Sequence, residues 1–211
     1  MKSTLNFEDF DKIVRNTSKV INDNSDFLCE LDSVVGDGDH GTTIARGLRK
    51  AIEAVDEESP DTISDLLTLT GNTMIESMGG ASGPIFGTLF KQMGRMSREK
   101  DEVTLEELYE MYKKSIDRVM GLGGAQPGDK TMVDSFMPAV ESLKASVDAG
   151  DDVVTAYAKM VEASKAGVEA TKEMVAKQGR ARYAGERGTG HQDAGATSVS
   201  LMIQAAHEAI S

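Results

Sequence analysis

Three aspartates crowd one short stretch of the chain, Leu31-Asp-Ser-Val-Val-Gly-Asp-Gly-Asp-His-Gly. Asp32, Asp37 and Asp39 lie within eight residues, with a glycine between the last two. Because glycine permits sharp turns, the three carboxylates can point toward one centre. Carboxylate oxygens are hard ligands, which suit Mg²⁺, Mn²⁺ or Ca²⁺ rather than zinc. The stretch therefore predicts a site for a hard divalent cation.

The neighbouring residues exclude one kind of cation site and favour another. An EF-hand is excluded, because the twelfth position counted from Asp37 is Leu48 instead of a bidentate Glu. Mg²⁺ bound by a few carboxylates completes its shell with water and substrate phosphate. The alternative is a solvated turn whose last Asp caps a helix that opens at His40. Neutral imidazole is a poor Mg²⁺ ligand, so His40 is interpreted either as a group that hydrogen-bonds phosphate or orients a carboxylate, or as a plain helix-start residue.

Glycine clusters in four parts of the sequence, at residues 36–41, 79–83, 121–128 and 179–195. Each cluster comes just before a predicted helix. Ordinary turns would need only one or two glycines each. Four such loops before helix N-termini predict that the loops converge at one end of a helical bundle, where backbone N–H groups and helix dipoles face an anion.

The second and third glycine clusters carry weaker signals. In residues 79–84, Ser82 is predicted at the N-cap and Pro84 at about the first helical position. No Lys-Ser/Thr pair follows, so this is not a Walker A loop, and the same residues could form an ordinary cap. Residues 121–132 can approach a flat ligand, with Met132 as an apolar contact, or serve as a long helix connection.

The fourth cluster is preceded by a basic segment. Between residues 177 and 187 one acid, Glu186, stands against four basic residues: Lys177, Arg180, Arg182 and Arg187. The whole chain has a formal net charge of −12, which disfavours binding to nucleic acid or anionic lipid. A local reversal of that charge indicates a phosphate or an acidic partner, and the alternative is a solvated basic loop.

The elements that must position these loops are predicted to be helices. From Leu105 to Met120, for example, apolar residues follow one-face helical spacing, and Thr104 with Glu107 forms a capping box. No run alternates apolar and polar residues convincingly, so no strand is predicted. The length of 211 residues fits a single domain spanning 1–211, and the fold class is predicted to be all-α.

Composition suggests where the protein works. The single Cys29 suits a reducing cytoplasm, and the acidic N-terminal stretch does not read as a signal peptide. No apolar run approaches the length of a membrane span, so we expect a cytoplasmic protein. Trp is absent and Met is abundant, at 12 residues, which predicts thioether side chains filling gaps between helices.

The set of chemistry-bearing residues favours phosphoryl transfer. No nucleophile elbow and no cysteine-centred signature is present in the sequence. Glycoside hydrolysis can use paired carboxylates, but it does not call for glycine-rich anion loops. Phosphoryl transfer relies on metal ions, Lys or Arg and backbone amides to position and neutralise charge.

Four motifs that follow one another over almost the whole chain resemble the DhaL subunits of dihydroxyacetone kinases. They are Asp32-x4-Asp37-x-Asp39-His40-Gly41, Gly79-Gly-Ala-Ser-Gly-Pro-x-Phe-Gly87, Pro127-Gly-Asp-Lys-Thr-Met132, and Gly179-Arg-Ala-x-Tyr-x-Gly-Glu-Arg187 with Gly190-His-Gln-Asp193. The resemblance implies eight antiparallel helices in a barrel, with a nucleotide at the end where the loops gather.

The resemblance also implies a ligand set but no catalytic side chain in this chain. Asp32, Asp37 and Asp39 would hold two Mg²⁺ ions that bridge the phosphates of ADP or ATP. The nucleotide contacts of the family fall on His40, Gly41, Thr42, Thr43, Ala81, Ser82, Gly123, Met132, Arg180, Asp193, Ala194 and Gly195. Relatives often carry Asn where this chain has Thr43.

In this family the nucleotide-loaded subunit donates phosphate to dihydroxyacetone, which is held covalently on a His of a separate DhaK subunit. Fused kinases exchange ADP for ATP, whereas phosphotransferase-system versions keep ADP resident and rephosphorylate it from a DhaM-type phosphohistidine protein. The stretch from Gly185 to Asp193 resembles the second version, and we expect a free-standing subunit of that kind. The alternatives are an ATP-dependent kinase subunit for another short-chain ketose, such as a four-carbon one, and a nucleotide-loaded regulatory module.

Overall fold

Nine α-helices make up most of residues 2–211, the part of the chain that this computed structural model describes. The helices are α1 (Phe7–Asp23), α2 (Ser25–Ser33), α3 (His40–Glu58), α4 (Ile63–Ser77), α5 (Ser82–Met96), α6 (Leu105–Gly123), α7 (Val133–Ala149), α8 (Val153–Ala170) and α9 (Ala194–Ile210). Short 3₁₀ turns, η1 (Thr171–Glu173), η2 (Ala181–Tyr183) and η3 (Gly185–Gly188), lie between α8 and α9.

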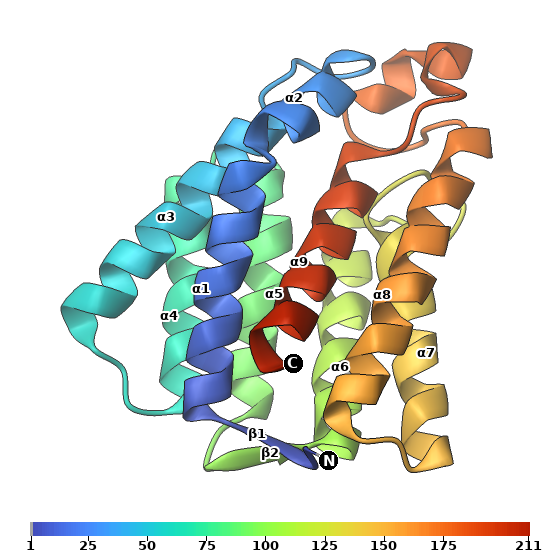
Figure 1. Cartoon of the computed structure of the whole chain (residues 1–211). Helices are drawn as coiled ribbons and strands as arrows, with labels where there is room; N and C mark the ends of the chain where they lie inside the picture. The colour runs from blue at the N-terminus through green and yellow to red at the C-terminus, as the bar shows by residue number, and fades with distance from the viewer. Residues whose placement is uncertain (1) are drawn as a thin grey trace.

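The eight long helices form a closed ring. From α3 to α9 each helix packs against the next, and α1 packs against both α3 and α9 (Figure 1). Neighbours run in opposite directions, which places the N-termini of α3, α5, α7 and α9 at one end together with the short α2 (Figure 1). The prediction of an all-α, eight-helix antiparallel barrel is confirmed.

Two short strands lie at the opposite end of the barrel, and here the prediction of no strand is wrong. Strand β1 (Thr4–Asn6) pairs antiparallel with β2 (Glu102–Thr104), and Leu5 is opposite Val103 with both side chains buried. Three-residue strands are too short to show an alternating pattern in the sequence. The last residue of β2 also caps α6, and the predicted capping box with Glu107 is confirmed.

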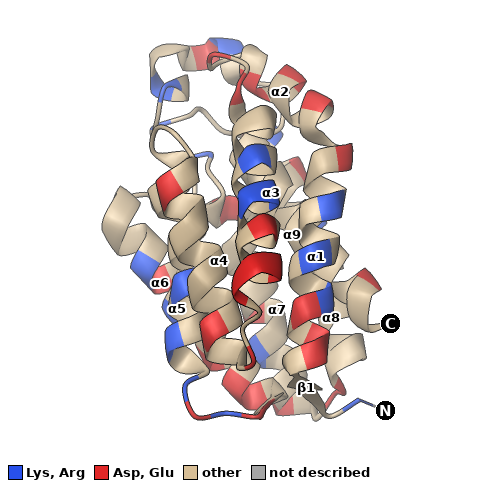
Figure 2. Cartoon of the chain, turned by 90° about the vertical axis from the view of Figure 1, so that its left-hand side faces the viewer, with Lys and Arg blue, Asp and Glu red and all other residues tan. Residues whose placement is uncertain are grey.

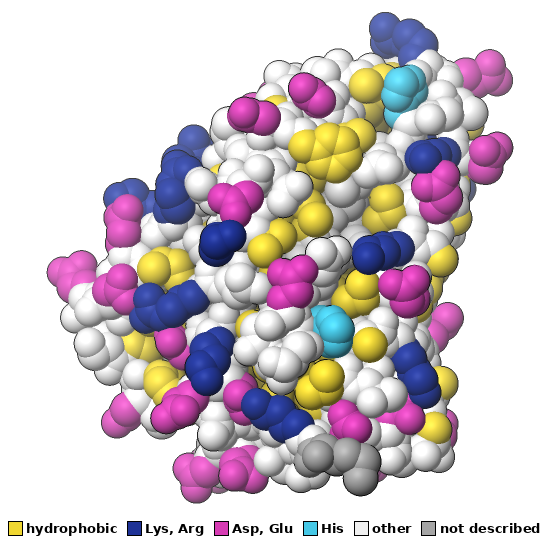
Figure 3. All heavy atoms as spheres, in the orientation of Figure 1, with side chains coloured by type: hydrophobic (Ala, Val, Ile, Leu, Met, Phe, Trp, Pro, Cys, Tyr) yellow, Lys and Arg dark blue, Asp and Glu magenta, His cyan; other side chains and the backbone are white. Residues whose placement is uncertain are grey.

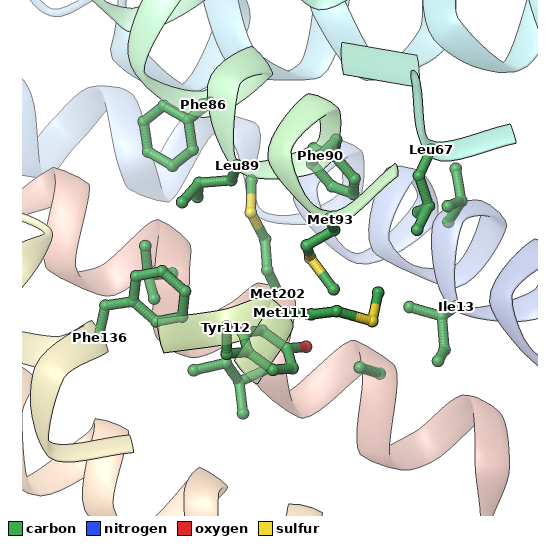
Figure 4. Packing of buried hydrophobic residues seen from close by; sticks show 14 of the residues in the cluster. Ile13, Leu67, Phe86, Leu89, Phe90, Met93, Met111, Tyr112, Phe136 and Met202 are labelled. Carbon is green, nitrogen blue, oxygen red and sulfur yellow. The ribbon is translucent and has the colours of Figure 1, made fainter. Parts of the chain in front are cut away.

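Side chains from many helices fill the centre of the ring. Met93 of α5, Met111 of α6 and Met202 of α9 lie close together there, as predicted for gap-filling thioethers (Figure 4). The buried hydroxyls of Tyr112 and Tyr157 share a hydrogen bond of 3.0 Å. The core can hold these two buried hydroxyl groups because each is the hydrogen-bond partner of the other.

Close backbone contact fixes the helical hairpins that carry the loops. A Cβ atom added to Gly71 of α4 would collide with the carbonyl oxygen of Gly87 in α5, and the reverse also holds. A Cβ on Gly167 of α8 would similarly strike the carbonyl oxygen of Asp134 in α7. Because interiors resist such overlap, glycine at these positions lets the helices pack closely and fixes where their connecting loops emerge.

Charged side chains cover the outer faces of the helices. Figure 2 shows both signs along the outside of the barrel. The face in Figure 3 likewise mixes acidic, basic and apolar side chains, with no single charge dominating it. None of the described helices is long and apolar enough to cross a membrane.

Candidate functional site

A cleft of about 620 Å³ opens at the end of the barrel where the glycine-rich loops meet. Residues from all four predicted loops line it, including Asp37, Gly79, Met132 and Arg180. The cleft lies among the N-termini of α3, α5, α7 and α9. Because each helix N-terminus carries partial positive charge and free N–H groups, this arrangement favours an anion.

The three predicted aspartates form one cluster on the cleft wall. Asp32, Asp37 and Asp39 each offer a carboxylate oxygen, and these oxygens lie within 4.8 Å of one another. Asp32 belongs to the last turn of α2, a helix that the sequence analysis did not predict, and Asp39 is the N-cap residue of α3. Asp37 and Asp39 are exposed and Asp32 is half-buried, so the oxygens remain accessible from the cleft.

Backbone hydrogen bonds shape the loop around the Asp32 carboxylate. Its Oδ2 atom accepts N–H bonds from Gly38 at 2.9 Å and Asp39 at 3.2 Å. A Cβ atom on Gly36 would overlap this carboxylate, and Gly38 has a φ of +74°, which favours glycine. The loop therefore presents hard oxygens in a shape that fits a divalent cation such as Mg²⁺.

A guanidinium group contacts the same cluster from the other side of the cleft. Arg180 forms an ion pair with Asp37, and its side chain is 72% exposed. Acidic residues near α2 and basic residues of the last loop meet at this end of the barrel (Figure 2). The basic segment predicted from the sequence thus lies opposite the acidic loop.

His40 is held at the base of the site as the first residue of α3. Its Nε2 atom lies 2.9 Å from the hydroxyl of Ser198 on α9, and its ring meets the edge of Phe86 at a centroid distance of 6.0 Å. Burial lowers the pKa of His40, and the negative charge of Asp32 offsets this only in part. The imidazole is therefore neutral near pH 7, so it serves as a hydrogen-bonding group and not as a fixed positive charge.

The N-terminus of α5 differs in detail from the prediction. Ala81, rather than Ser82, is the N-cap residue, and the helix has no side-chain cap hydrogen bond. Ser82 is the first residue of the helix. Pro84 is consequently the third helical residue instead of the first. A Cβ atom added to Gly79 or Gly80 would meet no atom within 4 Å, so open space surrounds this backbone at the cleft.

Asp193 closes the cleft as the N-cap residue of α9. Its Oδ2 atom accepts the N–H of Ala196 at 2.7 Å, and its own N–H donates to Thr171 at 2.9 Å. Burial raises the pKa of Asp193 to about 6, although the ammonium of Lys130 partly opposes that shift. The carboxylate therefore stabilises the start of α9 at a cost in desolvation.

The structure brings most of the predicted site residues to the cleft. Those that line it are Asp32, Asp37, Asp39, His40, Thr43, Ala81, Ser82, Met132, Arg180 and Asp193. The remaining predicted contacts, Gly41, Thr42, Gly123, Ala194 and Gly195, are not among the lining residues and stay predictions.

The sequence analysis missed several lining residues. Ile85 and Phe86 were not predicted as ligand contacts, although the glycine loop just before them places that helix turn at the cleft. Gln178 lies just before the last motif and Tyr183 within it, and neither was predicted as a ligand contact. Lys130 was noticed only as part of the motif Pro127-Gly-Asp-Lys-Thr-Met132, and the place of that motif at the end of a glycine-rich loop was the available signal.

Comparisons with known proteins give consistent results. The family model described as DAK2 domain matches residues 34–208. The chain is 42% identical over 180 residues to the Escherichia coli strain K12 protein named PEP-dependent dihydroxyacetone kinase, ADP-binding subunit DhaL, covering 85% of this chain and 86% of that protein.

The fold is also similar to solved structures of the dihydroxyacetone kinase of C. freundii. The native form matches with a TM-score of 0.75 at 25% identity over 99% of this chain, and the complex with AMP-PNP and Mg²⁺ matches with a TM-score of 0.69 over 93%. The chain spans 35% and 33% of those two structures.

Proposed function

The chain belongs to the DAK2 domain family, and from that premise we propose that it is the ADP-binding, phosphoryl-transferring subunit of a phosphoenolpyruvate-dependent dihydroxyacetone kinase. One observation carries the proposal: three carboxylates, Asp32, Asp37 and Asp39, gather beside a cleft surrounded by four helix N-termini. Such a cleft combines metal ligands with anion-binding backbone, the pairing that a nucleoside diphosphate on Mg²⁺ requires. The name of the E. coli relative specifies the same nucleotide and the same phosphate source.

The three aspartates would hold two Mg²⁺ ions. Bound Mg²⁺ would neutralise phosphate charge and hold the transferring group in line. For the chain itself, the role of these residues is to present preformed oxygens, since backbone N–H bonds already fix the Asp32 carboxylate. Arg180 lies across from them and supplies a further positive charge as phosphate arrives.

The rest of the nucleotide is proposed to follow the walls of the cleft. His40 and Thr43 at the start of α3, and Ser82 at the start of α5, would donate hydrogen bonds to phosphate oxygens. Ile85, Phe86 and Met132 would form an apolar contact for the flat base. The backbone of Gly41, Thr42, Gly123, Ala194 and Gly195 completes the proposed contact set.

Partner proteins are proposed to dock over the open end of the cleft. The described large hydrophobic side chains that remain exposed are Phe27, Leu122, Val175 and Tyr183, with Tyr183 exposed by 75%. All four lie on α2, at the end of α6 or in the segment after α8, which surround the cleft. Exposed apolar side chains beside basic residues suit a protein interface, here for a DhaK-type subunit and a DhaM-type phosphohistidine donor.

The deciding experiment supplies phosphate by two routes. The protein is mixed with its DhaK-type partner and dihydroxyacetone, with either ATP alone or a complete phosphoenolpyruvate-driven phosphotransferase chain. We expect sustained turnover only with the second source, and mass spectrometry of the gently purified protein should detect bound ADP. Sustained turnover on ATP alone would instead favour an ATP-dependent kinase subunit, and absence of turnover from both sources would favour a regulatory module.

A further inference from the structure

Lys130 is a buried cation surrounded by backbone carbonyl groups. Its side chain extends from the turn before α7, and the residue is only 4% exposed. The Nζ atom lies within hydrogen-bonding distance of four carbonyl oxygens, those of Thr171 at 2.7 Å, Met174 at 3.2 Å, Gly188 at 2.8 Å and His191 at 2.7 Å. Because an ammonium has three N–H groups, one of them is shared between two of these carbonyls. The carbonyl oxygens are the direct partners of the ammonium, and the carboxylate of Asp193 acts on it electrostatically without a hydrogen bond.

Three of these carbonyls come from the two ends of one segment, and the fourth, that of Thr171, lies just before it. Residues 174–191, which we call the Arg180 segment, connect η1 to the approach of α9 and cross the mouth of the cleft. Met174 is its first residue and Thr171 lies just before it in η1, whereas Gly188 and His191 belong to its end. One ammonium therefore holds both ends of the segment at a single point, much as a bound monovalent cation would.

The Arg180 segment has little apolar packing of its own to hold it. Ala176 is its only buried side chain, and its regular structure is limited to two short 3₁₀ turns. Segments of this kind open easily unless polar contacts restrain them. The contacts of Lys130 are thus a main restraint on its position.

The neighbouring residue Asp129 adds contacts to the same segment. Its carbonyl oxygen accepts the N–H of Lys177 at 3.0 Å, and its carboxylate accepts from Gln178 at 3.2 Å. Lys130 itself has a φ of +59°, a conformation that side-chain-bearing residues rarely adopt. The backbone strain and the buried charge both indicate that the turn is shaped to place this ammonium.

We propose that Lys130 is a positioning residue: by gathering the carbonyls at both ends of the Arg180 segment, it holds Arg180 over the carboxylate cluster and keeps the nucleotide enclosed. The effect on nucleotide retention rests on the proposed function, but the positioning of the segment does not. Lys130 need not touch the nucleotide, because the N–H groups of its ammonium are already engaged by backbone carbonyls.

The first test follows amide hydrogen exchange in the full-length, nucleotide-free protein. The substitution Lys130→Met keeps an unbranched side chain but removes its charge. In this variant, amides of residues 174–191 should exchange at least about tenfold faster while the long helices stay protected. The control is Lys172→Met, whose side chain pairs only with Glu169 on the surface, and this variant should exchange like the wild type. Unchanged exchange in residues 174–191, or equal loss of protection throughout the barrel, would overturn the proposal.

Lys130→Arg keeps the positive charge and serves as the second variant if Lys130→Met does not fold. A planar guanidinium cannot place one nitrogen at the centre of four carbonyls, so segment exchange should be intermediate between wild type and Lys130→Met. ADP dissociation measured by stopped flow should accelerate in the same order, by at least about tenfold for Lys130→Met. Faster segment exchange with an unchanged ADP dissociation rate would refute the link to retention, whereas absence of ADP binding in the wild type would instead refute the proposed function.

Discussion

Arg180 and Asp37, separated by 143 residues in the sequence, form an ion pair across the mouth of the cleft. Asp37 also belongs to the carboxylate cluster, so the guanidinium offsets negative charge at a proposed metal ligand. Both side chains are substantially exposed, and exposed pairs contribute only about 0–1 kcal/mol to stability. The pair therefore matters more for the electrostatics of the site than for the fold.

Replacement of Asp37 by Ala should abolish retention of ADP. Without this carboxylate the phosphate charges lack full metal neutralisation, and their repulsion in a partly dry site is strong. We expect the ADP content after gel filtration, measured by mass spectrometry, to fall at least about tenfold.

The matched control for that experiment is Asp61→Ala. Asp61 is an exposed acid in the connection between α3 and α4, at the opposite end of the barrel. The Asp61→Ala variant should retain as much ADP as the wild type. If Asp37→Ala also retains stoichiometric ADP, the acidic loop is not the metal site.

Removal of divalent metal should lower the melting temperature of the ADP-loaded protein. A ligand that binds only the folded state at a hundredfold excess over its Kd contributes about 2.7 kcal/mol, or roughly 5–10 °C for a domain of this size. Differential scanning calorimetry with EDTA should show this decrease, and added ADP without metal should not reverse it. A melting curve indifferent to EDTA would argue against a metal–nucleotide site.

Gly36→Ala should disrupt the carboxylate cluster without unfolding the barrel. The backbone of Gly36 does not require glycine, but the new Cβ atom would overlap the Asp32 carboxylate and displace it. We expect Mg²⁺-dependent ADP affinity, measured by calorimetric titration, to fall at least about tenfold.

Gly121→Ala provides the comparison for that substitution. A Cβ atom at Gly121 of α6 meets nothing within 4 Å, and Ala in place of a helical Gly stabilises by roughly 0.5–1 kcal/mol. This variant should bind ADP normally and melt slightly higher. Equal ADP affinity in Gly36→Ala and Gly121→Ala would show that the shape of the acidic loop is unimportant.

Asp193→Asn should change how stability depends on pH. The pKa of Asp193 is raised to about 6 in the folded protein, above roughly 3.9 for an unfolded Asp, so unfolding releases a proton between these values. The contribution of Asp193 to the free energy of unfolding therefore decreases as pH rises from about 4 to 6, and this loss is complete above about 6. Asn can still cap α9 but does not titrate.

Urea denaturation of the nucleotide-free protein measures this effect. The stability of Asp193→Asn relative to wild type should increase between pH 4 and 7.5, by at most about 3 kcal/mol. Asp151→Asn is the control, because a hydrogen bond from Lys159 lowers the pKa of Asp151 and its carboxyl is ionised in both states over most of this range. The stability of that variant should run parallel to that of the wild type above about pH 5. Parallel curves for Asp193→Asn and wild type would contradict the prediction.

The sequence by itself determined the long helices and the chemical type of the residues at the site. One-face apolar spacing is a local property, so the long helices and the capping box at Thr104 could be predicted from neighbouring residues. The three aspartates also lie close in sequence, so their cluster could be expected before any coordinates.

Only the tertiary structure decided which distant residues meet. The pairing of β1 with β2, the contact of His40 with Ser198 and the ion pair of Arg180 with Asp37 all join residues about a hundred or more positions apart. The surroundings of Lys130 could not be read from its motif either, because four backbone carbonyls have no sequence signature. Such contacts arise when the closed ring of helices brings separate loops to one end, and that ring is a property of the whole packing rather than of any segment.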